Sequence, residues 1–213
     1  MIKSNLILIG AGGHANACID VIEQHGRYQI AGLVGMPKEM NTQQLGYTVI
    51  ATDDEMTELA KEYQYAFIAV GQIQSPDNRM RLYQLAVRLG FQLPIVIAPT
   101  AYVSRHATIG AGSIVMHGAI VNGGAKVGDN CIINSRALIE HNAAVGDHCH
   151  ISTGAILNGN VKIGVGSFVG SGSVIKEGTS LGKGCVVGMG ISVRHNMMDH
   201  ARLPTHISVE HQA

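Results

Sequence analysis

A six-residue period of aliphatic side chains governs the second half of the chain. From residue 97 to residue 193, every sixth position is Ile, Leu or Val. These positions are Ile97, Val103, Ile109, Val115, Val121, Val127, Ile133, Ile139, Val145, Ile151, Leu157, Ile163, Val169, Ile175, Leu181, Val187 and Val193. A β-sandwich would instead show a period of two and irregular turn spacing. The pattern is typical of a chain that winds in coils with six-residue sides.

Small residues complete this repeat. The residue four positions after each aliphatic one is small, with Ile191 as the one large exception. Glycine often follows the aliphatic residue directly, as at Gly110 and Gly164, where we expect it to give the backbone freedom at a corner. Three such hexads make one coil. The sequence therefore predicts a left-handed parallel β-helix of hexapeptide repeats over residues 96–195, followed by a C-terminal tail over residues 196–213.

The first 95 residues follow a different pattern, in which short apolar runs alternate with stretches of helical period. The expected elements are strands over residues 6–9, 30–34 and 66–70 and helices over residues 15–24, 53–63 and 76–89. Strands that alternate with helices indicate a small, Rossmann-like, doubly wound α/β domain with a parallel sheet. We therefore expect residues 1–95 to form a separate domain.

Charge and composition exclude several kinds of partner. Lys+Arg and Asp+Glu both number 15, so the chain lacks the basic excess that nucleic acid or an anionic membrane would require. Hydrophobic residues make up 46% of the chain, which argues against disorder, and no apolar run reaches the roughly 18 residues of a membrane span. The four cysteines show no paired C-x-x-C spacing, so we expect no metal and a cytoplasmic protein.

A glycine-rich loop follows the first expected strand. Gly10-Ala11-Gly12-Gly13-His14 stands where a helix begins, and the free N–H groups of a helix N-terminus bind phosphate. An NAD site would also need an acidic residue after the second strand, where this chain has Val34-Gly35-Met36. The loop therefore favours a nucleoside diphosphate, with His14 reaching the diphosphate or the sugar. A purely structural turn is the alternative.

Further motifs occur in both halves of the chain. They are Phe67-Ile68-Ala69-Val70-Gly71, Ile132-Ile133-Asn134-Ser135, Ile139-Glu140-His141, Gly146-Asp147-His148-Cys149-His150-Ile151-Ser152 and Asn158-Gly159-Asn160-Val161-Lys162-Ile163-Gly164. With the glycine loop and the hexads, the chain resembles, over nearly its whole length, the acetyltransferases that modify nucleotide-linked amino sugars. The branch it resembles contains bacillosamine-, perosamine- and sialic-acid-pathway enzymes.

The resemblance implies an activity. It is an acetyl-CoA-dependent N-acetyltransferase that acts on the amino group of a nucleotide-linked amino-deoxy sugar, with a UDP-4-amino sugar as the preferred interpretation, in surface glycan biosynthesis. O-acetylation of sialic acid or a related sugar is the enzymatic alternative. A β-helix that only binds or scaffolds is the non-catalytic alternative, because β-helices can serve structure alone.

The resemblance also implies a role for each domain, with residues 1–95 binding the nucleotide sugar and residues 96–195 binding acetyl-CoA and carrying out catalysis. The residues expected to bind the nucleotide sugar are Gly12, Gly13, His14, Gly71 and Asn134, and those expected to bind acetyl-CoA are His150, Gly159, Ser171 and Met189. Most of the acetyl-CoA contacts would use backbone groups. Near the C-terminus, Arg202-Leu203-Pro204-Thr205 stands where many members of the family close with Gly-x-Pro-Ala.

The histidine that matches the family's general base is His141. Histidine suits this role because its ordinary pKa of about 6.5 lies near neutrality. No cysteine or serine is set in a recognisable nucleophile arrangement, which favours direct attack by the substrate amine. The next residue is usually acidic in the family but is Asn142 here. Its amide carbonyl can orient the imidazole, although it cannot stabilise the imidazolium as a carboxylate would.

The spacing of two histidines predicts an assembly. His141 and His150 are nine residues apart, which is half of an 18-residue coil. They should therefore lie on different sides of one β-helix. A homotrimer with active sites between subunits would bring one chain's His141 to its neighbour's His150, and the family resemblance also implies trimers.

Overall fold

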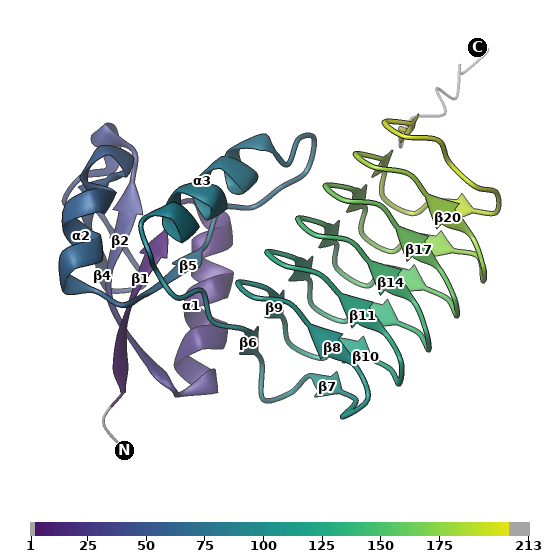
Figure 1. Ribbon diagram of the computed structural model, residues 1–213, viewed down its shortest axis with the longest axis horizontal. Coiled ribbons are helices and arrows are strands. Elements are labelled where there is room, and N and C mark those ends of the chain that lie inside the picture. The colour runs from purple at the N-terminus through teal and green to yellow at the C-terminus, as the bar shows by residue number, and fades with distance from the viewer. Residues whose placement is uncertain (1–2, 205–213) are drawn as a thin grey trace, which may run out of the picture.

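The computed structural model of the protein describes residues 3–204 and consists of an α/β domain joined to a stack of β-coils (Figure 1). This arrangement confirms the predicted fold class. The predicted tail over residues 196–213 extends in part outside the described residues, because nothing after Pro204 is described. None of the helices in the described part of the chain is long and apolar enough to cross a membrane.

The N-terminal domain contains a five-stranded sheet with helices on its faces. Its elements are β1 (Ser4–Ile9), α1 (Gly13–His25), β2 (Tyr28–Gly35), the 3-10 helix η1 (Pro37–Glu39), β3 (Gln43–Gln44), β4 (Tyr47–Thr52), the 3-10 helix η2 (Asp53–Glu55), α2 (Met56–Glu62), β5 (Tyr65–Ile68) and α3 (Asp77–Arg88). The strand order is β3-β4-β2-β1-β5. Four strands are parallel as predicted, but β3 runs antiparallel to β4, so the sheet is mixed. β3 and β4 are not among the strands expected from the sequence.

The hexads wind into the predicted β-helix, in which each side of a coil contributes a two-residue strand. The strands are β6 (Val96–Ile97), β7 (Tyr102–Val103), β8 (Thr108–Ile109), β9 (Ile114–Val115), β10 (Ile120–Val121), β11 (Lys126–Val127), β12 (Ile132–Ile133), β13 (Leu138–Ile139), β14 (Ala144–Val145), β15 (His150–Ile151), β16 (Ile156–Leu157), β17 (Lys162–Ile163), β18 (Phe168–Val169), β19 (Val174–Ile175), β20 (Ser180–Leu181), β21 (Val186–Val187), β22 (Ser192–Val193) and β23 (Arg202–Leu203). The periodic aliphatic residues point into the coils and, with the small residues, form one continuous core.

The strands stack into three parallel sheets. The domain-facing sheet contains β6, β9, β12, β15, β18, β21 and β23; the second sheet runs from β7 to β22, and the third sheet runs from β8 to β20. Partner residues on neighbouring strands are 18 apart, as in the pairing of Ile120 with Leu138. At the end of the stack Val186 pairs with Arg202, so the domain-facing sheet continues as far as Leu203.

The glycines that follow the aliphatic residues have a different role from the one predicted. Their φ angles are not positive; instead, a Cβ at Gly110 or Gly164 would collide with the backbone of the next coil. Glycine is required there because the coils stack closely. The left-handed backbone conformation falls two residues later in the hexad, as at Gly112 (φ 67°) and Asn142 (φ 57°).

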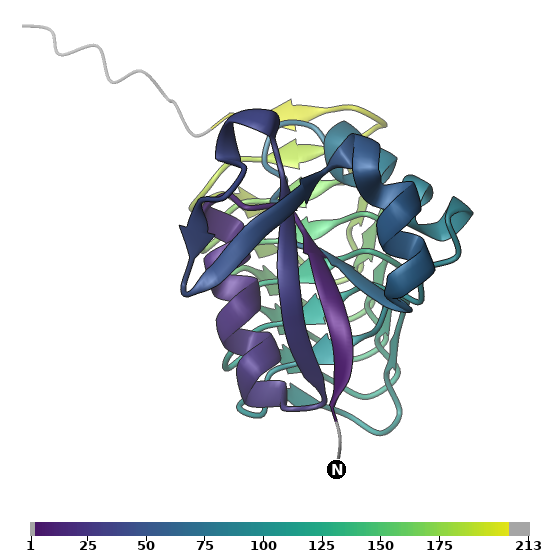
Figure 2. The same cartoon turned by 90° about the vertical axis from the view of Figure 1, so that its left-hand side faces the viewer.

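The two domains share a hydrophobic core. Buried residues of α1, such as Ile19 and Ile22, belong to one cluster with Ile114 and Ile132 of the domain-facing sheet. Figure 2 shows the α/β domain standing directly in front of the coils. The glycine loop at the start of α1 is thereby held beside the β-helix.

A buried guanidinium also joins the two domains. Arg79 of α3 is only 1% exposed and donates hydrogen bonds to the carbonyls of Ile68 (2.6 Å), Val70 (2.7 Å) and Asn130 (3.2 Å). The first carbonyl belongs to the last residue of β5, the second lies two residues after that strand, and the third lies at a corner of the β-helix. Burial lowers the pKa of Arg79 to about 10, so the group stays charged at neutral pH.

Candidate functional site

One pocket lies where the glycine loop meets α1, and we call it the loop pocket. It has a volume of about 560 Å³ and is lined by residues that include Gly12, Gly13, His14 and Gly71. Gly12 is the N-cap of α1, and no side chain caps the helix. The first N–H groups of α1 are therefore free to bind an anion.

The loop pocket also has polar residues that are not among the binding residues expected from the sequence. Arg81 of α3 lies within hydrogen-bonding distance of the Asp53 carboxylate (2.7 Å) and of the Asn78 side chain (3.0 Å), and all three line the pocket. Glu39 lines it as well and accepts a hydrogen bond from the backbone N–H of Met36. An acidic residue thus follows β2 after all, but it stands in η1, four residues beyond the end of the strand.

A second pocket, the β-helix pocket, runs along the domain-facing sheet and has a volume of about 600 Å³. Its walls are largely apolar and include Ile73, Phe168 and Val186. Four of the residues expected to bind substrates line it, namely Asn134, His150, Ser171 and Met189. Asn134 had been assigned to the nucleotide sugar, whereas the structure places it with the residues assigned to acetyl-CoA.

His150 lines this pocket with an uncharged imidazole. Its Nδ1 lies 2.6 Å from the backbone oxygen of Gln72, which only accepts, so Nδ1 carries the hydrogen. Its Nε2 then accepts from the side-chain amide of Asn134 at 3.1 Å. Burial lowers the pKa of His150 to about 4. Both ring nitrogens are therefore occupied, and the imidazole is uncharged at neutral pH.

The two pockets come close to each other at a pair of histidines. His14 lines the loop pocket, His150 lines the β-helix pocket, and their ring centroids are 6.4 Å apart. Burial lowers the pKa of His14 to about 3, and the charge of Arg79 adds to the shift. The buried Nε2 of His14 has no hydrogen-bond partner among the described residues. The neutral imidazole of His14, which lines the loop pocket, thus has an unused hydrogen-bonding atom.

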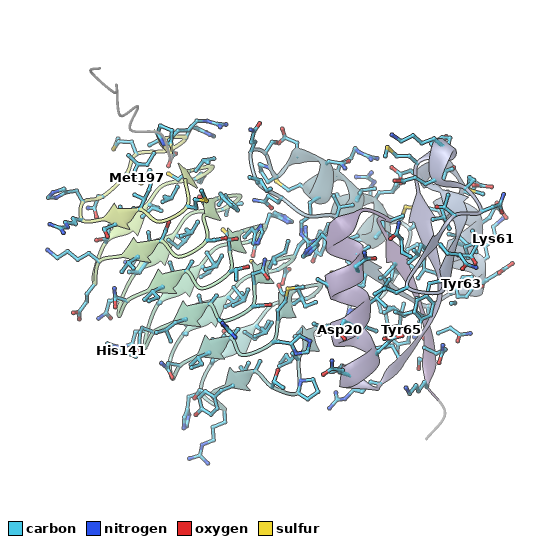
Figure 3. The ribbon with its side chains drawn as sticks, turned by 180° about the vertical axis from the view of Figure 1, so that it is seen from behind. Asp20, Lys61, Tyr63, Tyr65, His141 and Met197 are labelled. Carbon is cyan, nitrogen blue, oxygen red and sulfur yellow. The ribbon has the colours of Figure 1, made fainter. Side chains whose placement is uncertain are left out.

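His141 lies elsewhere, at an exposed corner between the second and third sheets (Figure 3). It lines neither pocket. Its ring sits above Gly159 of the next coil, where a Cβ would lie 2.5 Å from two atoms of the imidazole. The amide nitrogen of Asn142 is 3.5 Å from His141 Nδ1, and the Glu140 carboxylate accepts from the backbone N–H of His141 rather than from the ring.

The candidate residues therefore form three groups. Gly12, Gly13, His14 and Gly71 share the loop pocket, and Asn134, His150, Ser171 and Met189 share the β-helix pocket. The third group, His141, Asn142 and Gly159, lies at the far corner. Within residues 3–204, no three His, Cys, Asp or Glu side chains are grouped as a metal site would require.

Comparison with protein-family models matches both domains. Residues 5–84 match the PglD N-terminal domain. Residues 106–141 and 124–159 match the bacterial transferase hexapeptide (six repeats), and residues 160–194 match the hexapeptide repeat of succinyl-transferase. No curated protein sequence matches the chain significantly.

Solved structures resemble the whole chain. The acetyltransferase domain of PglB from Neisseria gonorrhoeae FA1090 is 32% identical over 94% of this chain and 96% of that chain, with a TM-score of 0.85. The same domain is known in complex with acetyl coenzyme A, with a TM-score of 0.84. PerB from Caulobacter crescentus, in complex with CoA and GDP-perosamine, is 30% identical over 95% of this chain and 94% of that chain, with a TM-score of 0.87.

Proposed function

Because the chain belongs to the PglD-type family of hexapeptide-repeat sugar N-acetyltransferases, we propose that it acetylates the amino group of a nucleotide-linked amino-deoxy sugar. It is an acetyltransferase, and acetyl-CoA is the proposed donor. For the acceptor we propose a UDP-linked 4-amino sugar, whose product would serve surface glycan biosynthesis.

The observation that carries this proposal is the short distance between the two pockets at His14 and His150. The free N–H groups of α1 in the loop pocket suit the diphosphate of a nucleotide sugar. The apolar walls of the β-helix pocket suit the pantetheine arm of acetyl-CoA. Since His14 lines one pocket and His150 lines the other, with 6.4 Å between their ring centroids, an acceptor amine and a thioester bound on either side would lie close together.

The proposed chemistry is direct acyl transfer with His141 as general base. The free amine attacks the thioester carbonyl carbon, and the carbon–sulfur bond breaks. His141 takes the proton from the amine and passes it to the departing sulfur. Its Nε2 can accept that proton only while Nδ1 carries a hydrogen. A half-turn of the Asn142 amide would direct its carbonyl oxygen at Nδ1 and favour this tautomer.

A neighbouring chain would have to supply His141, and we propose a homotrimer with active sites between subunits. The outward side chains of the second sheet support this assembly, because they form an apolar column of Tyr102, Ile120, Leu138, Ile156 and Val174. Tyr102 is 58% exposed and Ile120 is 40% exposed. A second copy packed there would cover this surface and bring its own domain-facing sheet near His141.

The proposed activity is tested with purified protein, acetyl-CoA, a thiol reagent and UDP-, dTDP-, GDP- and CMP-linked amino sugars. We expect thiol release with an amino sugar and an acetamide product by mass spectrometry. Release with a hydroxyl sugar alone, such as sialic acid, would replace N-acetylation by O-acetylation. No release with any acceptor would contradict the proposal.

Complementation tests the shared site. We expect His141→Ala and His150→Ala to be weakly active alone and to regain activity when the two variants are refolded together. Some mixed trimers would then contain one pocket with both wild-type histidines. Activity well above that of either parent supports the proposal. If mixed trimers form from inactive parents without recovery, the two histidines do not share a site between chains.

A substitution in the glycine loop tests the diphosphate site. We expect Gly13→Val to raise KM for the sugar nucleotide about tenfold or more, because the side chain would cover the N–H groups of α1. The KM for acetyl-CoA should change little. The variant should fold, since a Cβ at Gly13 meets nothing within 4 Å. Ala17→Val, on the exposed face of the same helix, is the matched control. Tight binding of NAD by calorimetry would contradict this assignment.

A further inference from the structure

One column of outward side chains extends along the domain-facing sheet through the β-helix pocket. His150, Phe168, Val186 and Arg202 occupy paired positions on β15, β18, β21 and β23, and all four line the pocket. Neighbouring strands lie about 4.8 Å apart, so three spacings separate the backbones of His150 and Arg202 by roughly 14 Å. The column has an imidazole at one end, a guanidinium at the other and apolar side chains between them.

Arg202 is the one residue that brings a full charge to this pocket within the described part of the chain. The other lining residues are apolar or neutral, and His150 is uncharged because burial lowers its pKa. No carboxylate among residues 3–204 forms an ion pair with Arg202. An arginine in a pocket without a counter-charge is suited to a ligand that carries its own negative charge.

The guanidinium of Arg202, an exposed residue, lies beside the connection between β5 and α3. One Nη2 hydrogen of Arg202 points to the carbonyl of Gln74 at 3.4 Å. The same connection is tied to the β-helix by Gln72, whose side chain donates to the carbonyl of Gly166 at 3.2 Å and whose own carbonyl accepts from His150. A guanidinium has five donors, so most of them are left to bind an anion at the pocket mouth.

We propose that Arg202 binds the diphosphate of acetyl-CoA and thereby places the thioester beside His150. The inference rests on the proposed function. About a dozen chain atoms separate the sulfur of CoA from its first phosphorus, as many as in four extended residues, which span roughly 14 Å. That length matches the distance along the column. A diphosphate on Arg202 therefore puts the sulfur level with His150, with the pantetheine arm against Phe168 and Val186.

We expect this contact to be particular to this chain within its family. Where Gly-x-Pro-Ala is common in the family, Arg202 takes the place of the glycine, which has no side chain to offer a charge. Leu203 and Pro204 also line the pocket, whereas Thr205 lies outside the described residues. We therefore expect Arg202 to strengthen the binding of the donor without taking part in the proton transfer.

Three donors of decreasing charge test the proposal: acetyl-CoA, acetyl-dephospho-CoA, which lacks the 3′-phosphate, and S-acetylpantetheine, which lacks all phosphates. For Arg202→Gln, we expect KM to rise about tenfold or more with the first two donors, as for the loss of a hydrogen-bonded contact to a charged group. The kcat should stay near that of the wild type. With S-acetylpantetheine, the variant and the wild type should have equal KM values.

Two further variants sharpen the result. Arg202→Lys keeps the charge but loses the planar fork, so it should recover only part of the affinity. Arg88→Gln removes an exposed arginine at the end of α3 that lines neither pocket and should leave all three KM values unchanged. Calorimetry with CoA and pantetheine repeats the comparison without any acceptor sugar.

The outcomes separate this inference from the proposed function. An unchanged KM for acetyl-CoA in Arg202→Gln, or an equal rise with S-acetylpantetheine, would overturn the inference while the enzyme remained an acetyltransferase of sugars. If the effect disappears already with acetyl-dephospho-CoA, Arg202 binds the 3′-phosphate, and the assignment to the diphosphate is wrong. If the wild type binds CoA in an Arg202-dependent manner but acetylates no amino sugar, the proposed function fails and the inference stands.

Discussion

His141→Ala should lower kcat by about 10²–10⁴ and leave both KM values close to those of the wild type. The range is that of a lost general base, because the amine must then give its proton to water. The fold should be unaffected, since the side chain is exposed at a corner and the core residue Ile139 is untouched. Steady-state kinetics with the acceptor found in the sugar screen give the measurement.

The matched control for this variant is His106→Ala. His106 is also exposed at a corner between the second and third sheets, two coils away from His141. It should retain wild-type turnover, and both variants should show the thermal unfolding of the parent. A His141→Ala enzyme with nearly full turnover would remove this residue from the mechanism.

Gly159→Ala should lower kcat by about ten- to a hundredfold through displacement of His141. The added Cβ would lie 2.5 Å from the Nε2 and Cε1 atoms of the imidazole, so the ring must move away. A displacement of about 1 Å in a catalytic group is enough for a loss of about 10²-fold. The KM for acetyl-CoA should change little.

Gly123→Ala is the control, because Gly123 has the same place in the coil on the other side of His141. A Cβ there meets only the Ser104 hydroxyl, at an ordinary 3.7 Å, and we expect normal activity. The KM also distinguishes two roles for Gly159. If its backbone served mainly to bind acetyl-CoA, as the family resemblance implies, KM would rise and kcat would hold.

The β-helix could be predicted from the sequence because its rule is local and repeated. A coil interior admits only compact aliphatic side chains, and the chain returns to the interior every six residues. In the N-terminal domain, β4 was missed although Val49 and Ala51 are buried on alternate positions of Tyr47–Thr52. That period of two was the signal, but it is short and follows an irregular segment.

The site could be predicted only in part, because its decisive contacts join distant residues. The hydrogen bond from His150 to Gln72 joins residues that are 78 positions apart in the sequence, so no local sequence pattern predicts it. Glu39 was missed because an acidic residue was expected directly after β2. The stacking role of Gly110 was also hidden, since sequence alone cannot distinguish a glycine that needs a positive φ from one that lies against a neighbouring backbone.

The joint made by Arg79 has a consequence for divergence among relatives. All three of its hydrogen-bond acceptors are main-chain oxygens, those of Ile68, Val70 and Asn130. A carbonyl oxygen is present whatever side chain the residue carries. Substitutions at these three positions therefore do not delete the joint, whereas loss of the arginine removes every one of its contacts at once. We therefore expect homologues that keep this arginine to tolerate other side chains at these three positions without losing this connection between the domains.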